Sequence, residues 1–509
     1  MVLLDNGDIL QGTPLVYYSN FYQPDSQNIT SRMLNYLKYD AASIGNHDIE
    51  TGHQVYDKFV SECNFPILAA NALHSKNNEP YFKPYHVIER GKIKIAILGL
   101  ITPAIPNWLP PSIYEGMIFS DMIESAREWC KIIAQKEKPD LLIGLFHSGF
   151  DYNYNGYNEQ SFKNENAAKL VALKVEGFDI VIAGHDNSMV STSITNESGK
   201  QVVLLNPGGL AEFIGVADCT FKLQKGKVVK TKIESKTEKV SDFVPDSAFL
   251  NKFEPFHNQV LKYIERPIGK LNQTLKTEDV LFGPGPLLNL IHQMQLQLTG
   301  ADISFSSPFS LNTRVEEGEL TIADMFSLYK FENLLYTMKL SGFEIKNYLE
   351  FSCGLWYNTM KDENDNLLLF SESDNNGKTG KLKNPVYNLS SAAGINYVVD
   401  VRKPVGERIE ILGFSNGNPF APDSVYLVAI NSYRAHGGGN HLTKGAGIEA
   451  DKLIGRIVTS TDKDLRFYLT QWIENQKEIS PPVYSNWKII PHDWVEKAKP
   501  GDLSKLFPK

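Results

Sequence analysis

Short and nearly continuous apolar runs recur through the first 230 residues, separated by amphipathic stretches. Runs of this kind are typical of strands buried on both faces of a sheet, with helices packed outside. We predict strands at VLLDN, AASIG, IKIAILGL, DLLIGLF, DIVIAG and QVVLL. A helix is expected over Ser120–Gln135, where apolar residues have helical spacing, and a last antiparallel strand over Asp218–Ser235. The pattern predicts an α/β fold.

A chain of 509 residues is too long for one core and suggests two domains. We predict a first domain over residues 1–235 and a second over residues 267–509. Residues 236–266 carry an apolar stripe with helical spacing, interrupted by Pro255, which should kink the helix. We interpret this segment as a linker helix, and a core helix of the first domain is the alternative. The polar stretch Lys361–Lys383 is predicted to be an exposed insertion.

Within the second domain, four segments have a clear pattern. Pro286–Leu298 has the apolar spacing of a helix. Leu334–Leu340, Tyr397–Val401 and Val425–Ile430 are apolar runs of strand length. The second domain is therefore also expected to be an α/β domain.

The composition limits the classes of molecule that this chain is expected to bind. The net charge of −8 argues against a nucleic-acid polymer, because binding to a phosphate backbone depends on an excess of Lys and Arg. A small anionic substrate remains compatible, since bound metal ions would dominate the local field. No apolar run reaches the roughly 18 residues that a membrane span needs. The four cysteines lack CxxC spacing, which favours buried thiols over zinc ligands or disulfides.

Polar side chains follow four of the predicted strands. Gly7-Asp8 comes after the first, and Asn46, His47 and Asp48 come after the second. His147 ends the run LLIGLFH, and His185 and Asn187 follow the run DIVIAG. In open α/β sheets, sites form just outside the carboxyl ends of the strands. We therefore expect these side chains to meet in one site.

The residue types suit a divalent metal. The two oxygens of Asp8 can bridge two ions, although a lone Asp at this position can also be a helix cap. The amide oxygen of Asn46 is a hard ligand, and the imidazoles of His147 and His185 are further candidates. His47 is then available to donate to a substrate, with Asp48 holding its tautomer. The competing interpretation of GNHD is a plain Asn turn before a helix.

The set GD, GNHD, H and GHxN, in that order, resembles the calcineurin-like metallophosphoesterases. The resemblance implies a four-layer α/β/β/α domain that binds two divalent ions, which would be Mn, Zn, Co or Mg. It also implies hydrolysis of a phosphate ester by a metal-bound hydroxide. Asn187 stands where the family carries His or Gln, and an amide oxygen there is a weaker ligand.

The second half of the chain resembles the 5'-nucleotidase C-terminal domain. The segments SLYKFENLL and AINSYRAHGGG are similar to the two segments of that domain that bind the nucleobase. The resemblance maps the two rings that clamp the base onto Phe331 and Tyr433, and a base-contacting Asn onto Asn333. Stacking on aromatic rings is worth roughly 1–3 kcal/mol per base. Two core aromatic residues are the alternative.

Details favour one branch of this family. SYRAHGGG, with Gly439 where many 5'-nucleotidases carry Asp, and SSPF at Ser306–Phe309 are similar to the 2',3'-cyclic-nucleotide 2'-phosphodiesterase/3'-nucleotidase branch. The resemblance implies a monomeric periplasmic or extracellular enzyme with a nucleotide substrate. A nucleotide-binding protein without turnover and a broad phosphomonoesterase are the alternatives.

One motif of the family is missing. Its members open with Asp-x-His on a first strand, and no Asp-x-His precedes Asp8. The chain keeps a full ligand set for one metal in Asp8, Asn46, His147 and His185, and only Asp8 and Asn187 for the other. There is also no secretion signal at Met1. We expect this sequence to be an N-terminally incomplete version of a longer, exported chain.

Overall fold

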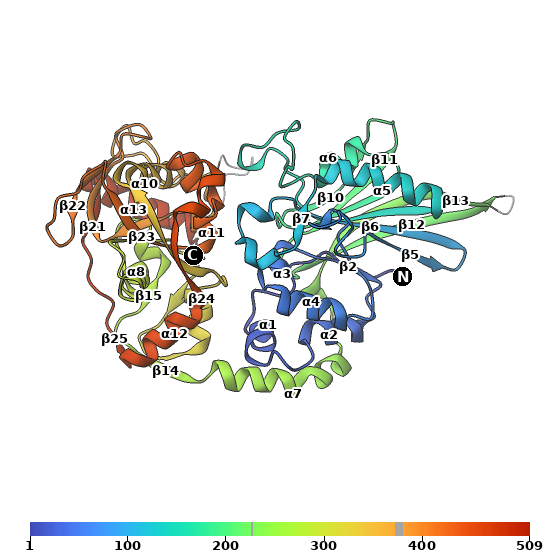
Figure 1. Cartoon of the computed structure of the whole chain (residues 1–509), viewed down its shortest axis with the longest axis horizontal. Helices are drawn as coiled ribbons and strands as arrows, with labels where there is room; N and C mark the ends of the chain where they lie inside the picture. The colour runs from blue at the N-terminus through green and yellow to red at the C-terminus, as the bar shows by residue number, and fades with distance from the viewer. Residues whose placement is uncertain (225–226, 372–379, 509) are drawn as a thin grey trace. The chain divides into compact units, whose positions relative to one another are not determined.

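The computed structural model describes residues 1–224, 227–371 and 380–508. The chain forms two compact units, Met1–Val260 and Leu261–Lys509 (Figure 1). Each unit has its own buried apolar clusters. The predicted domain bounds of 1–235 and 267–509 stay a prediction. We describe each unit by itself.

Two sheets form the middle of unit 1. The smaller sheet is parallel, in the order β1-β2-β3. The larger has the order β10-β11-β9-β8-β6-β5, parallel in its centre and antiparallel at both edges. The strands of the two sheets are β1 (Leu4–Asp5), β2 (Ala41–Ser43), β3 (Ile67–Leu68), β5 (Tyr85–Arg90), β6 (Ile93–Ile101), β8 (Leu141–His147), β9 (Ile180–Ala183), β10 (Met189–Thr195) and β11 (Gln201–Pro207).

The two sheets pack against each other, and helices cover their outer faces. Ala41 and Leu68 of the small sheet share a buried cluster with Ile97 and Leu145 of the large one. Helices α2 (Ile29–Leu37) and α4 (His53–Glu62) contribute to the cluster on the outer face of the small sheet. Helices α5 (Met122–Lys136) and α6 (Ala168–Lys174) cover the large sheet. The expected α/β/β/α arrangement is confirmed.

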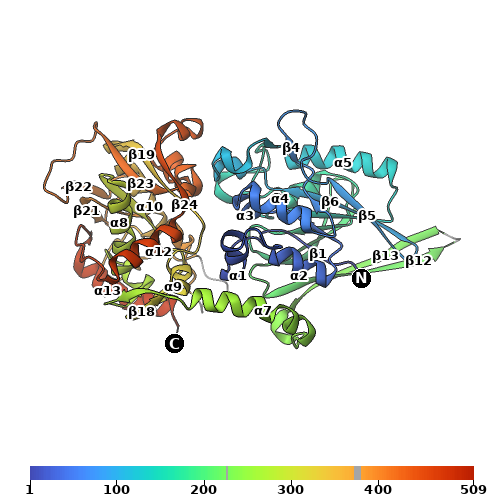
Figure 2. The same cartoon turned by 60° about the horizontal axis from the view of Figure 1, so that its bottom comes forward.

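Two predicted strands differ from the structure. β1 is shorter than residues 2–6 and only half-buried, because it lies at the edge of its sheet and pairs with β2 alone. The strand predicted over residues 218–235 is an antiparallel hairpin of β12 (Phe213–Gln224) and β13 (Lys227–Lys239), which extends from unit 1 (Figures 1 and 2). Apolar and polar residues alternate with a period of two through both strands, so the sequence pattern did not indicate the turn between them. Residues 225–226 lie outside the described part.

Helix α7 (Ser247–Ile264) occupies the segment that we interpreted as a linker. It runs on through Pro255 as one assigned helix. Its rings pack on unit 1, with Phe249 and Phe253 each 5.8 Å from the ring centre of Tyr36. The division between the two units falls inside α7, after Val260. Most of the helix therefore lies in the first unit, and only Phe253, Phe256 and Val260 of it are buried.

Unit 2 is built on a five-stranded sheet in the order β20-β16-β23-β19-β24. Val428 and Ile430 face one buried cluster and Ala429 faces the other, so both faces of the sheet are covered. Helix α10 (Gly342–Trp356) lies in the first cluster, and α8 (Pro286–Thr299) and α12 (Leu465–Gln476) lie in the second. The five strands are β16 (Ile303–Ser306), β19 (Leu334–Ser341), β20 (Ser391–Ala393), β23 (Val425–Asn431) and β24 (Ile457–Asp464).

Unit 2 also contains shorter strands and further α-helices. The remaining strands form the sheets β18-β14-β25, β22-β21-β26 and β15-β17. Their bounds are β14 (Pro267–Leu271), β15 (Leu275–Lys276), β17 (Arg314–Val315), β18 (Gly318–Thr321), β21 (Ile395–Asp400), β22 (Ile409–Phe414), β25 (Glu478–Ile479) and β26 (Trp487–Ile490). The further α-helices are α9 (Ile322–Leu328), α11 (Ser432–Ala435) and α13 (His492–Leu506).

Two other expectations can be compared with the structure. The predicted insertion 361–383 is exposed at its start, but Leu367 and Leu368 are buried in a core cluster, and residues 372–379 lie outside the described part. All four cysteines are free, with Cys130 and Cys353 buried. Among the described residues, no helix combines the length and the apolar character that crossing a bilayer requires.

Candidate active site

The four strand ends bring their side chains together. Asp8 follows β1, and Asn46 begins the short helix α3 (Asn46–Glu50) after β2. His147 is the last residue of β8, and His185 follows β9. Asp8 and His185 lie in the left-handed backbone region, with φ of 61° and 69°. These turns aim both side chains back across the ends of the strands.

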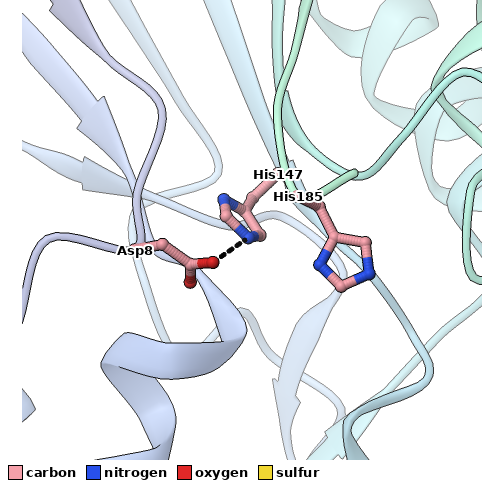
Figure 3. Close-up of side chains that lie close together, drawn as sticks. All are labelled: Asp8, His147 and His185. Carbon is pink, nitrogen blue, oxygen red and sulfur yellow. Dashed lines mark ion pairs between the residues drawn. The ribbon is translucent and has the colours of Figure 1, made fainter. Parts of the chain in front are cut away.

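The inward-facing atoms of these residues lie within contact distance. His147 Nε2 is 3.1 Å from Asp8 Oδ2 and 3.1 Å from Asn46 Oδ1. His185 Nδ1 is 2.8 Å from the same amide oxygen. Ligand atoms of Asp8, His147 and His185 all lie within 4.8 Å of one another (Figure 3). Gly45 is required beside them, because a Cβ there would lie 2.2 Å from Asp8 Oδ1.

The outward-facing ring nitrogens have acceptors of their own. His147 Nδ1 lies 2.6 Å from the carbonyl oxygen of Asn6, and His185 Nε2 lies 3.2 Å from Glu165 Oε1. A neutral imidazole has one N–H, so donation outward leaves a lone pair facing the centre. Two imidazole lone pairs, a carboxylate and an amide oxygen therefore converge. This donor set fits a divalent transition metal.

The electrostatics of the cluster favour positive charge at its centre. Burial by itself raises the pKa of Asp8, but the rings of His147 and His47 outweigh it and hold the pKa well below its usual range. Burial by itself lowers the pKa of His147, but the Asp8 carboxylate outweighs it and raises the pKa. Both pKa shifts have the same cause, which is the attraction between the Asp8 carboxylate and the positive charge of a neighbouring imidazole.

The predicted role of Asp48 needs correction. Its carboxylate accepts hydrogen bonds from the backbone N–H groups of Asp8, Ile9, Leu10 and Gly45, each at 2.8 Å, and the Nδ1 atom of His47 has another partner. Four such bonds explain how a fully buried carboxylate is tolerated. Asp48 therefore ties the loop that carries Asp8 to the loop that carries Asn46.

Glu50 takes the position beside His47 that we had given to Asp48. His47 Nδ1 lies 2.7 Å from Glu50 Oε2, one helical turn further along α3. Burial by itself lowers the pKa of His47, but the carboxylates of Asp8 and Glu50 outweigh it and raise the pKa to about 9. The spacing of three residues between His47 and Glu50 was visible in the sequence and could have suggested this pair.

Asn187 is exposed, and its φ is 52°. A Cβ at Gly209 would lie 2.5 Å from Asn187 Oδ1, so the amide packs closely on that backbone. No hydrogen bond joins Asn187 to the cluster of Asp8, Asn46, His147 and His185 in the described part of the chain. Its role as a ligand stays a prediction.

Two residues at the cluster carried no prediction. The carboxylate of Glu165 contacts His185 from a segment without strand or helix periodicity. The ring of Trp108 stacks on His185, with centres 5.4 Å apart and an interplanar angle of 27°. Contacts between segments far apart in the sequence place both side chains. Only the general suitability of a Glu as a partner for a His could have suggested Glu165 from the sequence.

In unit 2, Phe331 and Tyr433 lie at neighbouring strand ends. β19 and β23 are antiparallel, with Leu335 opposite Asn431, and Leu334 N donates to Ser432 Oγ at 3.1 Å. Phe331 and Tyr433 are half-buried, whereas Asn333 is 5% exposed. The structure therefore places the two ring-bearing segments side by side.

Buried arginines hold both segments through backbone oxygens. Arg466 Nε and Nη2 donate to the carbonyl oxygens of Tyr329 and Lys330, at 3.0 and 2.9 Å. Arg434 Nη1 donates to the carbonyl oxygen of Gly438 at 2.7 Å. A Cβ at Gly438 would lie 2.5 Å from Cε2 of Tyr433, so this ring packs against the Gly438 backbone. The rings of Phe331 and Tyr433 therefore lie on loops that are held by buried arginines, and we call these the braced loops.

Comparison with known proteins agrees with these features. Residues 267–444 match the family model of the 5'-nucleotidase C-terminal domain. Over 96% of its length, the chain is 27% identical to the trifunctional nucleotide phosphoesterase protein YfkN of Bacillus subtilis, of which it spans only 36%. It is 25% identical to the 2',3'-cyclic-nucleotide 2'-phosphodiesterase/3'-nucleotidase of Haemophilus influenzae, over 96% of this chain and 80% of that protein.

A solved structure shows the same fold along nearly the whole chain. The 5'-nucleotidase precursor of Thermus thermophilus superposes with a TM-score of 0.64 and 20% identity, covering 96% of this chain and 90% of that one. At this identity, the match is evidence for the fold alone. Residues 267–444 are therefore a 5'-nucleotidase C-terminal domain, and the chain has the two-domain α/β fold of the 5'-nucleotidases.

Proposed function

We propose that this protein hydrolyses phosphate esters of nucleotides in a metal-dependent reaction, as a 2',3'-cyclic-nucleotide 2'-phosphodiesterase and a 3'- or 5'-nucleotidase. The observation that carries the proposal is the convergence of Asp8, Asn46, His147 and His185, with an acceptor outside the cluster beside the outer nitrogen of each ring. The names of the similar proteins give the substrate class. An exported, monomeric enzyme stays a prediction from the family resemblance.

Asp8, Asn46, His147 and His185 would hold one divalent ion, and Asp8 with Asn187 would contribute to a second. Divalent ions supply a nucleophilic water at neutral pH and neutralise phosphate charge. His47 would donate to the phosphoryl oxygens and stabilise the charge that develops there. Glu50 supports that role, because its carboxylate favours the protonated ring.

The base would bind in unit 2. Phe331 and Tyr433 would stack on its two faces, and Asn333 would contact its edge. The braced loops support this role, because a ring that is held in place loses little entropy when the base stacks on it. Stacking is sequence-tolerant, so several nucleobases should be accepted.

A panel of substrates tests the proposal. The purified chain, in Mn²⁺, Zn²⁺ or Co²⁺, is given 2',3'-cyclic AMP, 3'-AMP, 5'-AMP and a small aryl phosphate. We expect hydrolysis of at least one nucleotide, with a higher kcat/KM than for the aryl ester. Asp8→Asn should abolish it, whereas Asp57→Asn, on α4 with a 43% exposed side chain, should not.

The same panel distinguishes the alternatives. Equal efficiency on nucleotides and the aryl ester would indicate a broad phosphomonoesterase. Nucleotide binding without hydrolysis at every metal would indicate a binding protein. Either result would overturn the proposed activity.

A further inference from the structure

The carboxylate of Glu165 lies behind His185, on the side away from Asp8 and Asn46. Its Oε1 is 3.2 Å from His185 Nε2, while the other ring nitrogen is 2.8 Å from Asn46 Oδ1. The side chains of Glu165 and His185 are 9% and 12% exposed. A carboxylate this buried is costly unless it is paired, and the ring N–H of His185 provides the pairing.

The backbone of Glu165 is fixed on the same strand ends as the site. Its carbonyl oxygen accepts hydrogen bonds from Thr102 Oγ1 at 3.0 Å and from Ser148 Oγ at 2.8 Å. Thr102 follows β6 and Ser148 follows β8, directly after His147. The next residue, Asn166, accepts from Gly149 N at 3.2 Å. The carboxylate is therefore presented by a rigid support.

We infer that Glu165 is a positioning residue that holds His185 in the tautomer with the proton on Nε2 and the lone pair of Nδ1 facing the metal site. This inference rests on the proposed metal site. His147 is held in the equivalent way by a neutral acceptor, the carbonyl oxygen of Asn6 at 2.6 Å. A carboxylate partner also makes the imidazole a stronger donor to a metal, so Glu165 tunes one of the two ring ligands.

Equilibrium metal binding tests the inference independently of activity. Glu165→Leu removes the acceptor at similar size, and Glu165→Gln keeps an acceptor oxygen. Loss of such a partner typically weakens metal affinity about 10- to 100-fold. We expect a loss in this range for Glu165→Leu and a much smaller loss for Glu165→Gln. Glu159→Leu is the matched control, because its 54% exposed side chain pairs with Lys174 at the surface.

A double-mutant cycle separates positioning from general support of the fold. If Glu165 acts through the ring, Glu165→Leu should cause no further loss of affinity in a His185→Ala background. An equal loss in both backgrounds would overturn the inference, as would wild-type affinity in Glu165→Leu. If the unaltered chain binds no divalent cation, the proposed function itself fails. Thermal melting of each metal-free variant confirms that it is folded.

Discussion

At the residue scale, the candidate metal site depends on where two imidazole rings carry their protons. His147 and His185 each turn one nitrogen toward Asn46 Oδ1 and the other toward an acceptor outside the cluster. Neutral rings that donate outward would turn the lone pairs of both inner nitrogens toward Asp8 and Asn46, and a bound cation would stabilise that arrangement. The positions of the ring nitrogens and of their acceptors therefore give stronger support for a metal site than the presence of two histidines alone.

His47 should affect turnover without affecting metal content. Its ring pairs with Glu50, and its backbone N–H donates to Asp8 Oδ1 at 2.9 Å. We expect His47→Ala to lower kcat at least tenfold, because a donor to the developing charge is lost. Metal analysis of the same sample should give the wild-type value. The control is His257→Ala, which changes an exposed histidine on α7. If His47→Ala loses metal in step with activity, His47 is a metal ligand.

Asp48→Asn should destabilise unit 1. The carboxylate accepts four backbone hydrogen bonds, and an amide can accept at only one of its two positions. Each oxygen accepts two of these bonds, so the amide loses two; at about 1.5–3 kcal/mol for each bond to a charged group, we expect a loss of about 3–6 kcal/mol in the free energy of unfolding. Denaturant unfolding measures it. A variant as stable as wild type would mean that the two loops are held by other contacts.

The sequence identified most of the candidate cluster but not its supporting contacts. Asp8, Asn46, His147 and His185 could be named because each follows an apolar run, and such positions converge in an α/β fold. Glu165 could not, because its contact with His185 depends on how a segment without periodicity folds back. Asp48 was given the wrong partner, since adjacency in sequence does not show which way a side chain points in the first turn of a helix.

At the scale of elements, the ends of β19 and β23 carry the candidate base site. We expect Phe331→Ala and Tyr433→Ala to raise KM for a nucleotide about tenfold or more, given stacking worth roughly 1–3 kcal/mol. Hydrolysis of a small aryl phosphate should change little, because that ester has no base to stack. Steady-state kinetics on both substrates measure the difference. Equal losses on the two substrates would identify these rings as core residues.

His292, on α8, should make unit 2 sensitive to acid. It is buried between Ser304 Oγ and Ser391 Oγ, at 2.9 and 3.1 Å, and burial lowers its pKa to about 3. Between pH 6.5 and this value, the unfolded chain binds a proton that the folded chain does not, so stability falls as the pH falls. From pH 7 to pH 5, the contribution is about 2 kcal/mol.

The matched variant His292→Asn isolates this contribution. Unfolding by denaturant at pH 7 and pH 5 should show a fall in stability that is about 2 kcal/mol smaller in the variant than in the wild type. The same fall in both proteins would show that His292 becomes protonated in the folded state.

Several strands that are buried on both faces had positions that could be predicted from the sequence. β6, β8 and β11 begin within one residue of their predicted starts, because both faces are covered and the apolar run is continuous. The apolar pattern predicted the bounds of two elements less well. These are β1, which pairs on one side only, and the β12–β13 hairpin, in which the alternation of apolar and polar residues runs through the turn. The division inside α7 depends on its contacts with Tyr36 and could not be read from its apolar stripe.

At the scale of the whole molecule, the chemistry and the recognition are assigned to different units. Unit 1 carries the convergent ligands, and unit 2 carries the family match and the braced aromatic loops. Each unit has its own core, so substitutions in one should leave the other folded. The proposed function therefore predicts that base recognition and phosphate-ester hydrolysis can be altered independently.

The central claim is that the cluster around Asp8 binds a divalent ion that the reaction requires. The direct measurement removes metal with a chelator, then titrates Mn²⁺, Zn²⁺ or Co²⁺ back while recording bound metal per chain and the rate of 2',3'-cyclic nucleotide hydrolysis in the same samples. Bound metal and the rate of hydrolysis should fall together on chelation and return together when metal is added. In the Asp8→Asn variant, neither should return. Full activity in a sample from which all metal has been removed would contradict the claim.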